Sequence, residues 1–386
     1  MPDHVNPTPS AALADIAPRL RRRPDIEAPS LLAHDATDRL VLAEAEGLGL
    51  GAAPGQLPAD VVVIGDRHGA LTLAALAGGV DHVRVHQDEL TGELALAANA
   101  ETLGLTGFTH HPLGADLLAG ARLVLLQLPR SLDALDEIAA HVAAHAHPEV
   151  RVVAGGRLKH MSRTMNDVLA RHFARIDVSL AQQKSRVLHA ADPLPTSTLD
   201  WPRTERHGDL AVVAHGGVFA GTGLDIGTRH LLTFEPQMRA ADTAIDLGCG
   251  SGVLATSLAL ARPDSRVIAT DQSSAAVASA TATAAAAANG VGERVRVVRD
   301  NGLASQPDAS ADLIVLNPPF HAGAAVAPDI APRLFEHAAR VLRPGGELWC
   351  VYNSHLDHKG ALAKIVGRTR QAGRNAKFTV TVSTRR

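Results

Sequence analysis

The chain has 386 residues, of which 46% are apolar, and a formal net charge of −3. Such a length predicts two domains, and the apolar fraction is sufficient to fill two cores. The weakly acidic balance excludes a protein that binds nucleic acid through its overall charge, so any such surface must be local. The two cysteines, Cys249 and Cys350, exclude a disulfide framework and a zinc site built from cysteines.

No segment of the sequence has the pattern of a membrane anchor or a metal site. Residues 1–10 are rich in proline and lack the apolar centre of a signal peptide, and no apolar run approaches membrane-spanning length. His355 and His358 have the spacing of one helix face, but no carboxylate or cysteine stands at ligand spacing from them. We therefore expect a cytoplasmic protein without a membrane partner and without a metal ion.

The first half of the chain alternates predicted strands and helices. The apolar segment 61–64 predicts a strand, and the turn G-D-R-H-G at 65–69 leads into an apolar helix start. Asp88 follows the next predicted strand, and the apolar segment 123–126 precedes Q-L-P-R at 127–130. This alternation predicts an α/β domain with a mostly parallel sheet.

Basic residues gather at several places in the same half. They are Arg19, Arg21, Arg22 and Arg23 near the start, then Arg157, Lys159, His160, Arg163, Lys184 and Arg186. Each cluster is interpreted either as a nucleic-acid contact or as an ordinary solvated surface, and the first run also as the charged end of a helix. Residues 191–198 are rich in proline, serine and threonine, which predicts a linker between domains 1–195 and 205–386.

The second half opens its sheet with the motif D-L-G-C-G-S-G at 246–252. The motif follows apolar residues and precedes V-L-A-T-S-L, so a strand turns into a helix there. Glycines at such a turn let backbone N–H groups approach a ligand closely. Asp271 ends the next predicted strand 19 residues after Gly252, where a carboxylate can accept both hydroxyls of a ribose. The dinucleotide fingerprint G-x-G-x-x-G fails, because Leu254 and Ala255 stand where its third glycine would fall.

Two further strands complete the predicted site. Residues 296–299 precede Asp300, and the alanine-rich segment 275–288 predicts a helix before them. The apolar strand 313–316 precedes N-P-P-F at 317–320, which opens a loop at the carboxyl end of the sheet. An isolated N-P-P is more often a strand-ending turn, but its place after a cofactor turn favours catalysis. The Asn317 oxygen and the Pro318 carbonyl can accept both hydrogens of an exocyclic amine and orient its lone pair.

The two halves repeat each other. Segment 65–69 matches 248–252 at an offset of 183, which also relates Asp88 to Asp271, and 127–130 matches 317–320 at an offset of 190. The first copy has lost the chemistry. Arg67 replaces Gly250, Val63 replaces Asp246, and Leu128 and Arg130 replace a proline and the phenylalanine. A bulky cation in a turn that needs bare backbone is expected to block cofactor binding.

These motifs resemble those of the S-adenosylmethionine-dependent methyltransferases. The resemblance implies two tandem Rossmann-like class I methyltransferase domains, of which the second binds S-adenosyl-L-methionine and is active. It assigns the cofactor contacts to Asp246, Gly248, Cys249, Gly250, Gly252, Asp271, Gln272, Asp300, Asn301 and Asn317, together with Thr222 and Asp225. It assigns the catalytic loop to Asn317, Pro318, Pro319 and Phe320, with Phe320 stacking on the base.

A degenerate copy in front of an N-P-P-F domain is similar to the bacterial ribosomal-RNA guanine-N2 methyltransferases. Segments G-V-F at 217–219, T-G-L-D-I-G-T at 222–228 and F-H at 320–321 carry this resemblance, and segments 353–357 and 375–378 favour its large-subunit branch. It implies transfer to guanine N2 in naked or partly assembled ribosomal RNA, with the first domain docking RNA and a base in a duplex flipped out. Transfer to adenine N6 or a protein glutamine, or a non-catalytic RNA-binding assembly role, remain alternatives. The oligomeric state is left open.

Overall fold

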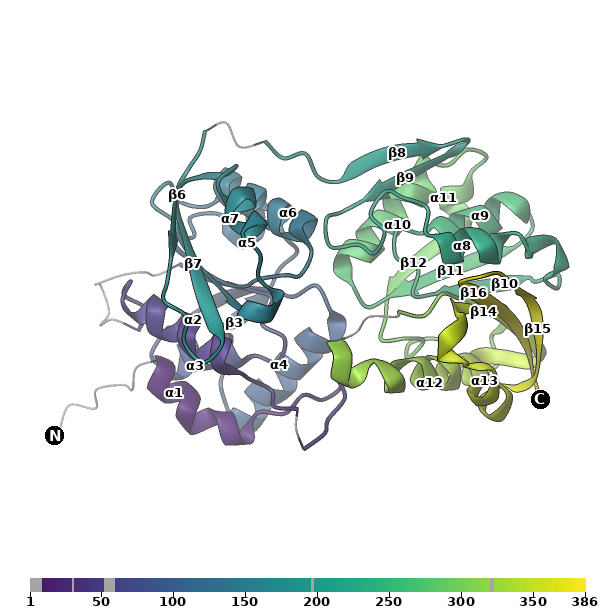
Figure 1. Cartoon of the computed structure of the whole chain (residues 1–386), viewed down its shortest axis with the longest axis horizontal. Coiled ribbons are helices and arrows are strands. Elements are labelled where there is room, and N and C mark those ends of the chain that lie inside the picture. Colours follow the sequence, from purple (N-terminus) through teal and green to yellow (C-terminus); the bar gives the residue numbers. More distant parts are fainter. Residues whose placement is uncertain (1–8, 30, 52–59, 196–197, 320–322) are drawn as a thin grey trace. The chain divides into compact units, whose positions relative to one another are not determined.

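The chain folds into two compact units, residues Met1–Trp201 and Pro202–Arg386 (Figure 1). The computed structural model describes residues 9–29, 31–51, 60–195, 198–319 and 323–386. Within these ranges, no helix is both long and apolar enough to cross a membrane. Each unit is described by itself below.

The first unit contains a seven-stranded sheet in the order β3-β2-β1-β4-β5-β7-β6. The first five strands along the chain run parallel, and β7 is antiparallel to its neighbours β5 and β6. The strands are β1 (Val61–Ile64), β2 (Val83–His86), β3 (Phe108–His110), β4 (Leu123–Gln127), β5 (Arg151–Arg157), β6 (Phe173–Val178) and β7 (Ser185–Pro193). The helices are α1 (Pro9–Ile16), α2 (Ala36–Glu46), α3 (Ala70–Ala77), α4 (Leu90–Leu103), α5 (Ala115–Leu118), α6 (Leu132–His145) and α7 (Thr164–Leu169), with short 3-10 turns η1 (Ala17–Arg19) and η2 (Leu158–His160).

The second unit repeats this sheet in the order β12-β11-β10-β13-β14-β16-β15, preceded by the hairpin β8-β9. The strands are β8 (Arg203–His207), β9 (Leu210–Ala214), β10 (Thr243–Leu247), β11 (Arg266–Asp271), β12 (Val295–Arg299), β13 (Ala311–Leu316), β14 (Leu342–Asn353), β15 (Gly367–Arg374) and β16 (Phe378–Arg385). The helices are α8 (Ile226–Leu232), α9 (Val253–Ala261), α10 (Ser274–Ala286), α11 (Val291–Arg294), α12 (Gly323–Val341) and α13 (Lys359–Ile365), with short 3-10 turns η3 (Glu235–Gln237) and η4 (Ser354–Leu356). Two mostly parallel sheets flanked by helices confirm the predicted fold class.

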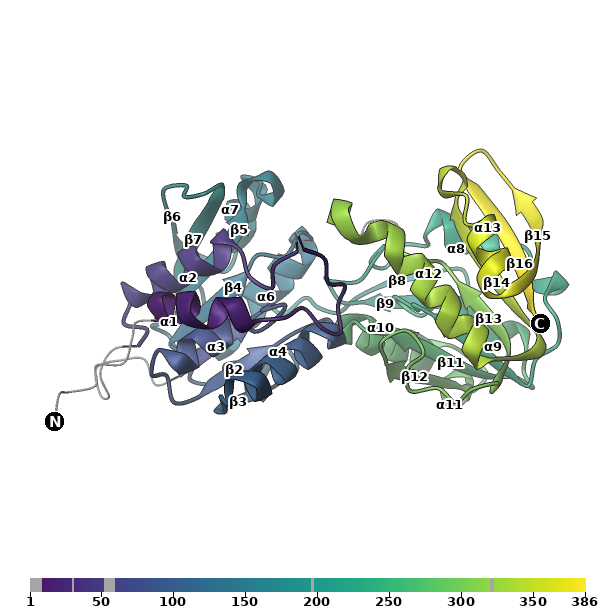
Figure 2. The same cartoon turned by 90° about the horizontal axis from the view of Figure 1, so that it is seen from below.

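The central strands of the second unit are buried on both faces, as a parallel sheet requires. Ala244 on β10 packs with Leu254 and Ala280 of α9 and α10 on one face. Ile245, the next residue, packs with Phe335 of α12 on the other, and Figure 2 shows α12 along the sheet. The carboxyl ends of all five parallel strands lie at the same end of the sheet. The loops that follow β10, β11, β12 and β13 therefore come together there.

Two sequence predictions need adjustment. The predicted linker 191–198 begins inside the fold, because its first three residues continue β7, where Arg151 pairs with Ala191. A local composition rich in proline did not reveal that an antiparallel partner extends the strand. The predicted helix 275–288 is α10 and ends at Ala286, two residues earlier than expected.

Candidate active site

The glycine turn links β10 to α9 through left-handed backbone. Gly248, Gly250 and Gly252 have φ of +76°, +52° and +79°, which favours glycine over any residue with a side chain. A Cβ at Gly252 would lie 2.8 Å from the Ala280 backbone, so this glycine also lets α10 pack closely. A Cβ at Gly248 or Gly250 would meet no described atom within 4 Å, so the backbone there faces open space.

Two carboxylates hold this turn. Asp246 is fully buried and accepts a hydrogen bond from Ala255 N at 2.9 Å, and its other oxygen, Oδ1, has no partner among the described residues. Burial, together with the nearby Asp271 carboxylate, raises the pKa of Asp246 to about 7. Asp271 Oδ2 accepts from Gly250 N at 3.0 Å, and its Oδ1 accepts from Ser273 N at 3.0 Å. The predicted ribose acid is therefore next to the glycine turn.

The remaining predicted cofactor residues differ in what they contact. Asp300 is buried beside Asp271, its carboxylate accepting from Ser305 N and Oγ. Gln272 follows Asp271 and its carbonyl accepts from Arg299, and Asn301 follows Asp300 and is half-buried. The Cys249 thiol has a pKa raised by burial, so it is not a reactive thiolate. Contacts of these residues with a cofactor stay predictions.

Asn317 directly follows β13, and its amide is held in one orientation. Its Nδ2 donates to Asp225 Oδ2 at 2.9 Å and to Thr228 Oγ1 at 3.1 Å. A carboxylate oxygen only accepts, so the amide nitrogen must face Asp225. The Asn317 Oδ1 atom is buried and has no partner among the described residues. An unpaired buried acceptor costs free energy, so this oxygen is available to accept a hydrogen bond from a ligand.

The prolines that follow have different surroundings. Pro318 is buried and Pro319 is exposed. Phe320, predicted to stack on a base, lies outside the described residues. Two consecutive prolines fix φ and remove two donors, which leaves the loop carbonyls available as acceptors.

Two residues near the start of α8, Gly227 and Thr228, were not predicted as site residues. Asp225 caps the helix by accepting from Thr228 N at 2.9 Å, and both residues bind Asn317. A Cβ at Gly227 would lie 3.5 Å from Asn317 Nδ2 and 3.2 Å from Phe378, so a small residue is needed between them. Asp225 was predicted to contact the cofactor, and that contact stays a prediction. Its described contact is with Asn317. The only available signal for Gly227 and Thr228 was their place in the motif that begins at Thr222.

Thr222 itself is tied to the β8-β9 hairpin. Its hydroxyl donates to Glu205 at 2.9 Å, and its carbonyl accepts from His207 at 2.8 Å. Its predicted contact with a cofactor stays a prediction.

The residues fit S-adenosylmethionine. This cofactor carries two cationic centres, a ribose diol and an adenine, which call for acceptors and for close backbone approach. Gly248 and Gly250 leave open space beside the turn, and Asp246 offers an unpaired buried oxygen. When bound, the cofactor supplies an electrophilic methyl group.

The first unit retains the turn but not its open surface. Gly65 and Gly69 keep left-handed φ of +80° and +88°, as Gly248 and Gly252 do. The carboxylate that caps the following helix comes from Asp66, which accepts from Thr72 N at 2.8 Å. Thr72 is the counterpart of Ala255 at the offset of 183, so Asp66 has taken the role of Asp246 from a position three residues later.

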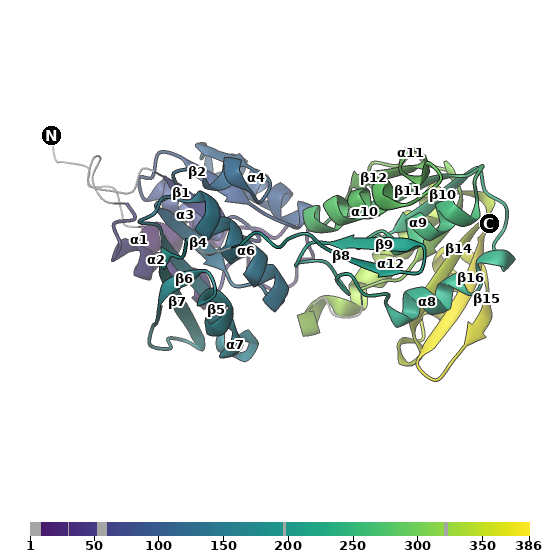
Figure 3. The same cartoon turned by 90° about the horizontal axis from the view of Figure 1, so that it is seen from above.

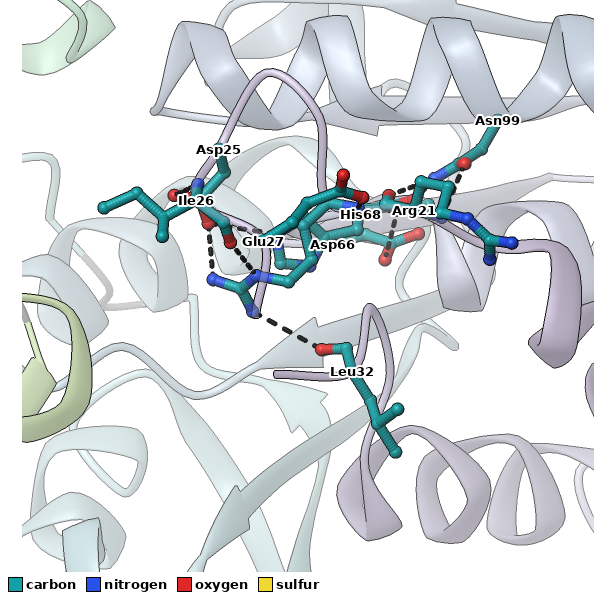
Figure 4. A network of polar contacts seen from close by, with 10 residues as sticks. Arg21, Asp25, Ile26, Glu27, Leu32, Asp66, His68 and Asn99 are labelled. Carbon is teal, nitrogen blue, oxygen red and sulfur yellow. Dashed lines mark hydrogen bonds and ion pairs between the residues drawn. The ribbon is translucent and has the colours of Figure 1, made fainter. Parts of the chain in front are cut away.

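The segment that follows η1 covers this turn, as Figure 4 shows. Asn99 on α4 binds the backbone of Arg21 through both amide atoms, at 2.9 and 2.8 Å, and also donates to His68 O at 2.8 Å. His68 Nε2 lies 3.3 Å from Asp25 Oδ2, and Arg22 pairs with Asp25. The arginine run is therefore engaged within the first domain, since Arg19 binds Thr102 O and Arg23 pairs with Glu27.

The counterpart of the Asn317 contact also persists. Gln127 is the last residue of β4 and donates to Asp38 on α2. In the same way, Asn317 directly follows β13 and donates to Thr228 on α8. Both pairs are related by the offset of 190. Burial raises the pKa of Asp38 to about 7. The contact between strand end and helix start is thus common to the two units.

Comparisons with known proteins agree with this division. The model of the RLMG N-terminal domain matches residues 9–193, and that of the Methyltransferase small domain matches residues 209–382. The solved T. thermophilus 16S rRNA N2 G1207 methyltransferase, in complex with AdoMet and guanosine, has the same fold, with a TM-score of 0.72, 20% identity and 92% of each chain covered.

Curated relatives match over almost the whole length. The ribosomal RNA large subunit methyltransferase G of Streptomyces avermitilis is 34% identical over 378 residues, covering 94% of this chain and 95% of that protein. The protein of the same name from Pseudomonas aeruginosa is 36% identical over 371 residues, covering 94% and 96%. The predicted resemblance and its large-subunit branch are confirmed. The chain therefore belongs to the ribosomal RNA large subunit methyltransferase G family.

Proposed function

We propose that the second unit transfers the methyl group of S-adenosylmethionine to the exocyclic N2 amine of a guanine in ribosomal RNA. The observation that carries this proposal is the orientation of Asn317, whose amide nitrogen is bound by Asp225 and Thr228 while its buried oxygen is unpaired. An amine with two hydrogens is the complementary donor. The family name and the guanosine in the T. thermophilus complex support ribosomal RNA and guanine as the substrate.

The chemistry follows from two acceptors. The lone pair of an exocyclic amine is delocalised into the base, which makes the amine a poor nucleophile. The Asn317 oxygen and the Pro318 carbonyl each accept one amine hydrogen, so the nitrogen becomes more tetrahedral and its lone pair points away from them. Preset acceptors act by positioning and by their dipoles, and no general base is needed before transfer. The surplus proton leaves to water afterwards.

The first unit is proposed to dock the RNA. The pKa of His160 is lowered by desolvation and by the positive charges of its neighbours Arg130, Lys159, Arg67 and Arg157. This cluster lies where strands β1 and β4 end, so the first unit has cations where the second unit has Gly250 and the catalytic loop. Phosphate groups are the natural ligands of such a cluster.

The test is transfer of radiolabelled methyl to ribosomal RNA from a strain that lacks the gene, followed by nucleoside analysis. We expect label in N2-methylguanosine with the wild-type chain. Asn317→Ala should lower kcat by about 10²- to 10³-fold, as loss of one preset transition-state contact does. Circular dichroism and thermal unfolding of the variant serve as the control for folding.

The other outcomes separate the alternatives. Label in N6-methyladenosine would keep the mechanism and change the base, and label in protein would replace RNA with a glutamine substrate. If Asn317→Ala restores the phenotype of the deletion strain, a non-catalytic assembly role is supported instead.

A further inference from the structure

The carboxyl-terminal part of the second unit is strongly basic. Residues 354–386 contain eight lysines and arginines and one acid, Asp357, whereas the whole chain has a net charge of −3. Positive charge is therefore concentrated in this segment while the rest of the chain is acidic. A local concentration of this kind is the signature that overall charge conceals.

These cations gather at a free edge of the sheet. Strand β15 pairs only with β16 and forms one edge, seen in Figure 3 beside the C-terminus. We define the basic edge as six residues: Arg368, Arg370 and Arg374 on β15, Lys377 in the turn, and, at the end of the chain, Arg385 within β16 and Arg386 after it. Five of them are exposed, and Arg385 is half-buried.

Salt bridges among the described residues do not neutralise the basic edge. None of its six cations forms an ion pair within the part of the chain that the structure describes. By contrast, Arg340 at the end of α12 pairs with Asp308, and Arg343 at the start of β14 pairs with Asp312. Unpaired charge of one sign along a strand raises the free energy of the isolated protein and favours an anionic ligand.

One end of the basic edge meets the candidate active site. Lys377 Nζ lies 5.4 Å from the centre of the Phe378 ring. The same ring is 3.2 Å from the position of a Cβ on Gly227, which is itself 3.5 Å from Asn317 Nδ2. The hairpin turn of β15 and β16 is thus next to the residues that orient the catalytic amide.

The other end lies at the start of β15, where Gly367 pairs with Arg385. Arg385 and Arg386 line a cavity of about 330 Å³, and the Nη1 atom of Arg385 is buried without a partner among the described residues. A strand of eight residues extends about 26 Å at the usual rise. The cations therefore follow a line that starts at Asn317 and is long enough for several consecutive phosphates.

We propose that the basic edge binds the phosphodiester backbone of the RNA whose base enters the Asn317 site. The proposal rests on the proposed function for the identity of the ligand. Arginine binds phosphate through two parallel N–H bonds, and contacts to phosphate fix the register of the strand without reading its sequence. Charges on an edge strand also prevent pairing between sheets of different molecules. That role would need no continuity with the active site.

The experiment measures binding of a fluorescein-labelled transcript of large-subunit ribosomal RNA to the full chain, without cofactor, from 50 to 300 mM salt. Arg368→Gln/Arg374→Gln removes two charges from the basic edge. The matched control, Arg266→Gln/Arg296→Gln, removes one exposed charge from β11 and one from β12, the strand at the opposite edge of the same sheet. A third pair, Lys159→Gln/Arg163→Gln, tests docking by the first unit in the same assay.

We expect the edge variant to bind about tenfold more weakly at low salt, and its slope of log affinity against log salt to fall by about 1.4 to 1.8. The control pair should bind like the wild type. In methyl transfer, the edge variant should show a raised KM for RNA and a kcat within about twofold. Circular dichroism checks that all variants are folded.

Unchanged affinity of the edge variant, or an equal loss in the control pair, overturns the proposal. So does self-association of the edge variant, seen by light scattering, with RNA affinity retained. A wild-type chain that binds RNA through the edge but methylates none would refute the proposed function and leave the basic edge standing.

Discussion

Asn317 illustrates what sequence can and cannot predict about a site. Its catalytic role was predicted from its place after a strand and behind a glycine turn, and it stays a proposal. Its partner Thr228 lies 89 residues earlier, and no local pattern connects the two. They come together only through the packing of α8 against the sheet, where it contacts β14 and β16. Spacing along the sequence can thus nominate residues of a cofactor turn. The residues that orient the Asn317 amide depend on packing between distant elements, which spacing does not reveal.

Thr228→Val should lower kcat by about three- to tenfold, because one hydrogen bond to the Asn317 amide is lost while the shape of the side chain is kept. Thr228→Ser keeps the hydroxyl and should retain most of the activity. Steady-state kinetics with ribosomal RNA, together with calorimetric cofactor affinity, is the measurement. An unchanged kcat in Thr228→Val would show that Asp225 alone orients the amide.

At the level of elements, each unit attaches an outer segment to the same helix in the same way. In the second unit, Thr283 on α10 binds both the amide and the carbonyl of Val213 on β9, at 3.0 and 3.2 Å. In the first unit, Asn99 on α4 binds both backbone groups of Arg21. A polar side chain in the middle of a helix therefore holds a neighbouring chain in both copies.

The strands were predictable because buried parallel strands are continuously apolar, as β1, β4, β10 and β13 are. The function of the segment around Arg21 was not. A run of arginines has the same composition whether it binds RNA or the protein itself. The deciding contacts come from Asp25 and Asn99, of which Asn99 is 78 residues away from Arg21.

Asn99→Ala should destabilise the first unit by about 2 kcal/mol, because one buried and two partly buried hydrogen bonds are lost and the backbone of Arg21 is left unpaired. Hydrogen–deuterium exchange should accelerate in residues 20–27 and 65–69. Thr102→Ala, on the same helix, is the control: it removes a hydroxyl that donates to Ala98 O, keeps the backbone carbonyl that Arg19 binds, and should leave exchange there unaltered. Equal protection in both variants would mean that Asn99 is not what holds the segment.

At the scale of the whole molecule, two copies of one fold have divided the work. Both sheets have the same strand order, and both turns keep two left-handed glycines. The first copy has Arg67 where the second has Gly250, and the chain around Asp25 is bonded to His68 within its turn. The fold of both copies was predictable from the internal repeat, and the loss of chemistry in the first copy stays a prediction.

We expect one S-adenosylmethionine per chain in a calorimetric titration of the full-length protein. Arg67 and the segment bound to His68 leave the first unit without bare backbone for a second molecule. Gly250→Arg, which gives the second turn the residue of the first, should reduce the stoichiometry to zero. A value of two for the wild type would contradict the division of work between the copies.

The carboxylate that caps the first turn bears on the history of the chain. Thr72 N is bound by Asp66, whereas its counterpart Ala255 N is bound by Asp246, which corresponds to Val63. Suppose that both copies descend from one ancestor with an acid at position 63. That acid could be lost without leaving the Thr72 amide unpaired only after Asp66 had arisen. The order of substitutions is then constrained by stability, and reconstructed ancestors should contain both acids before either is lost.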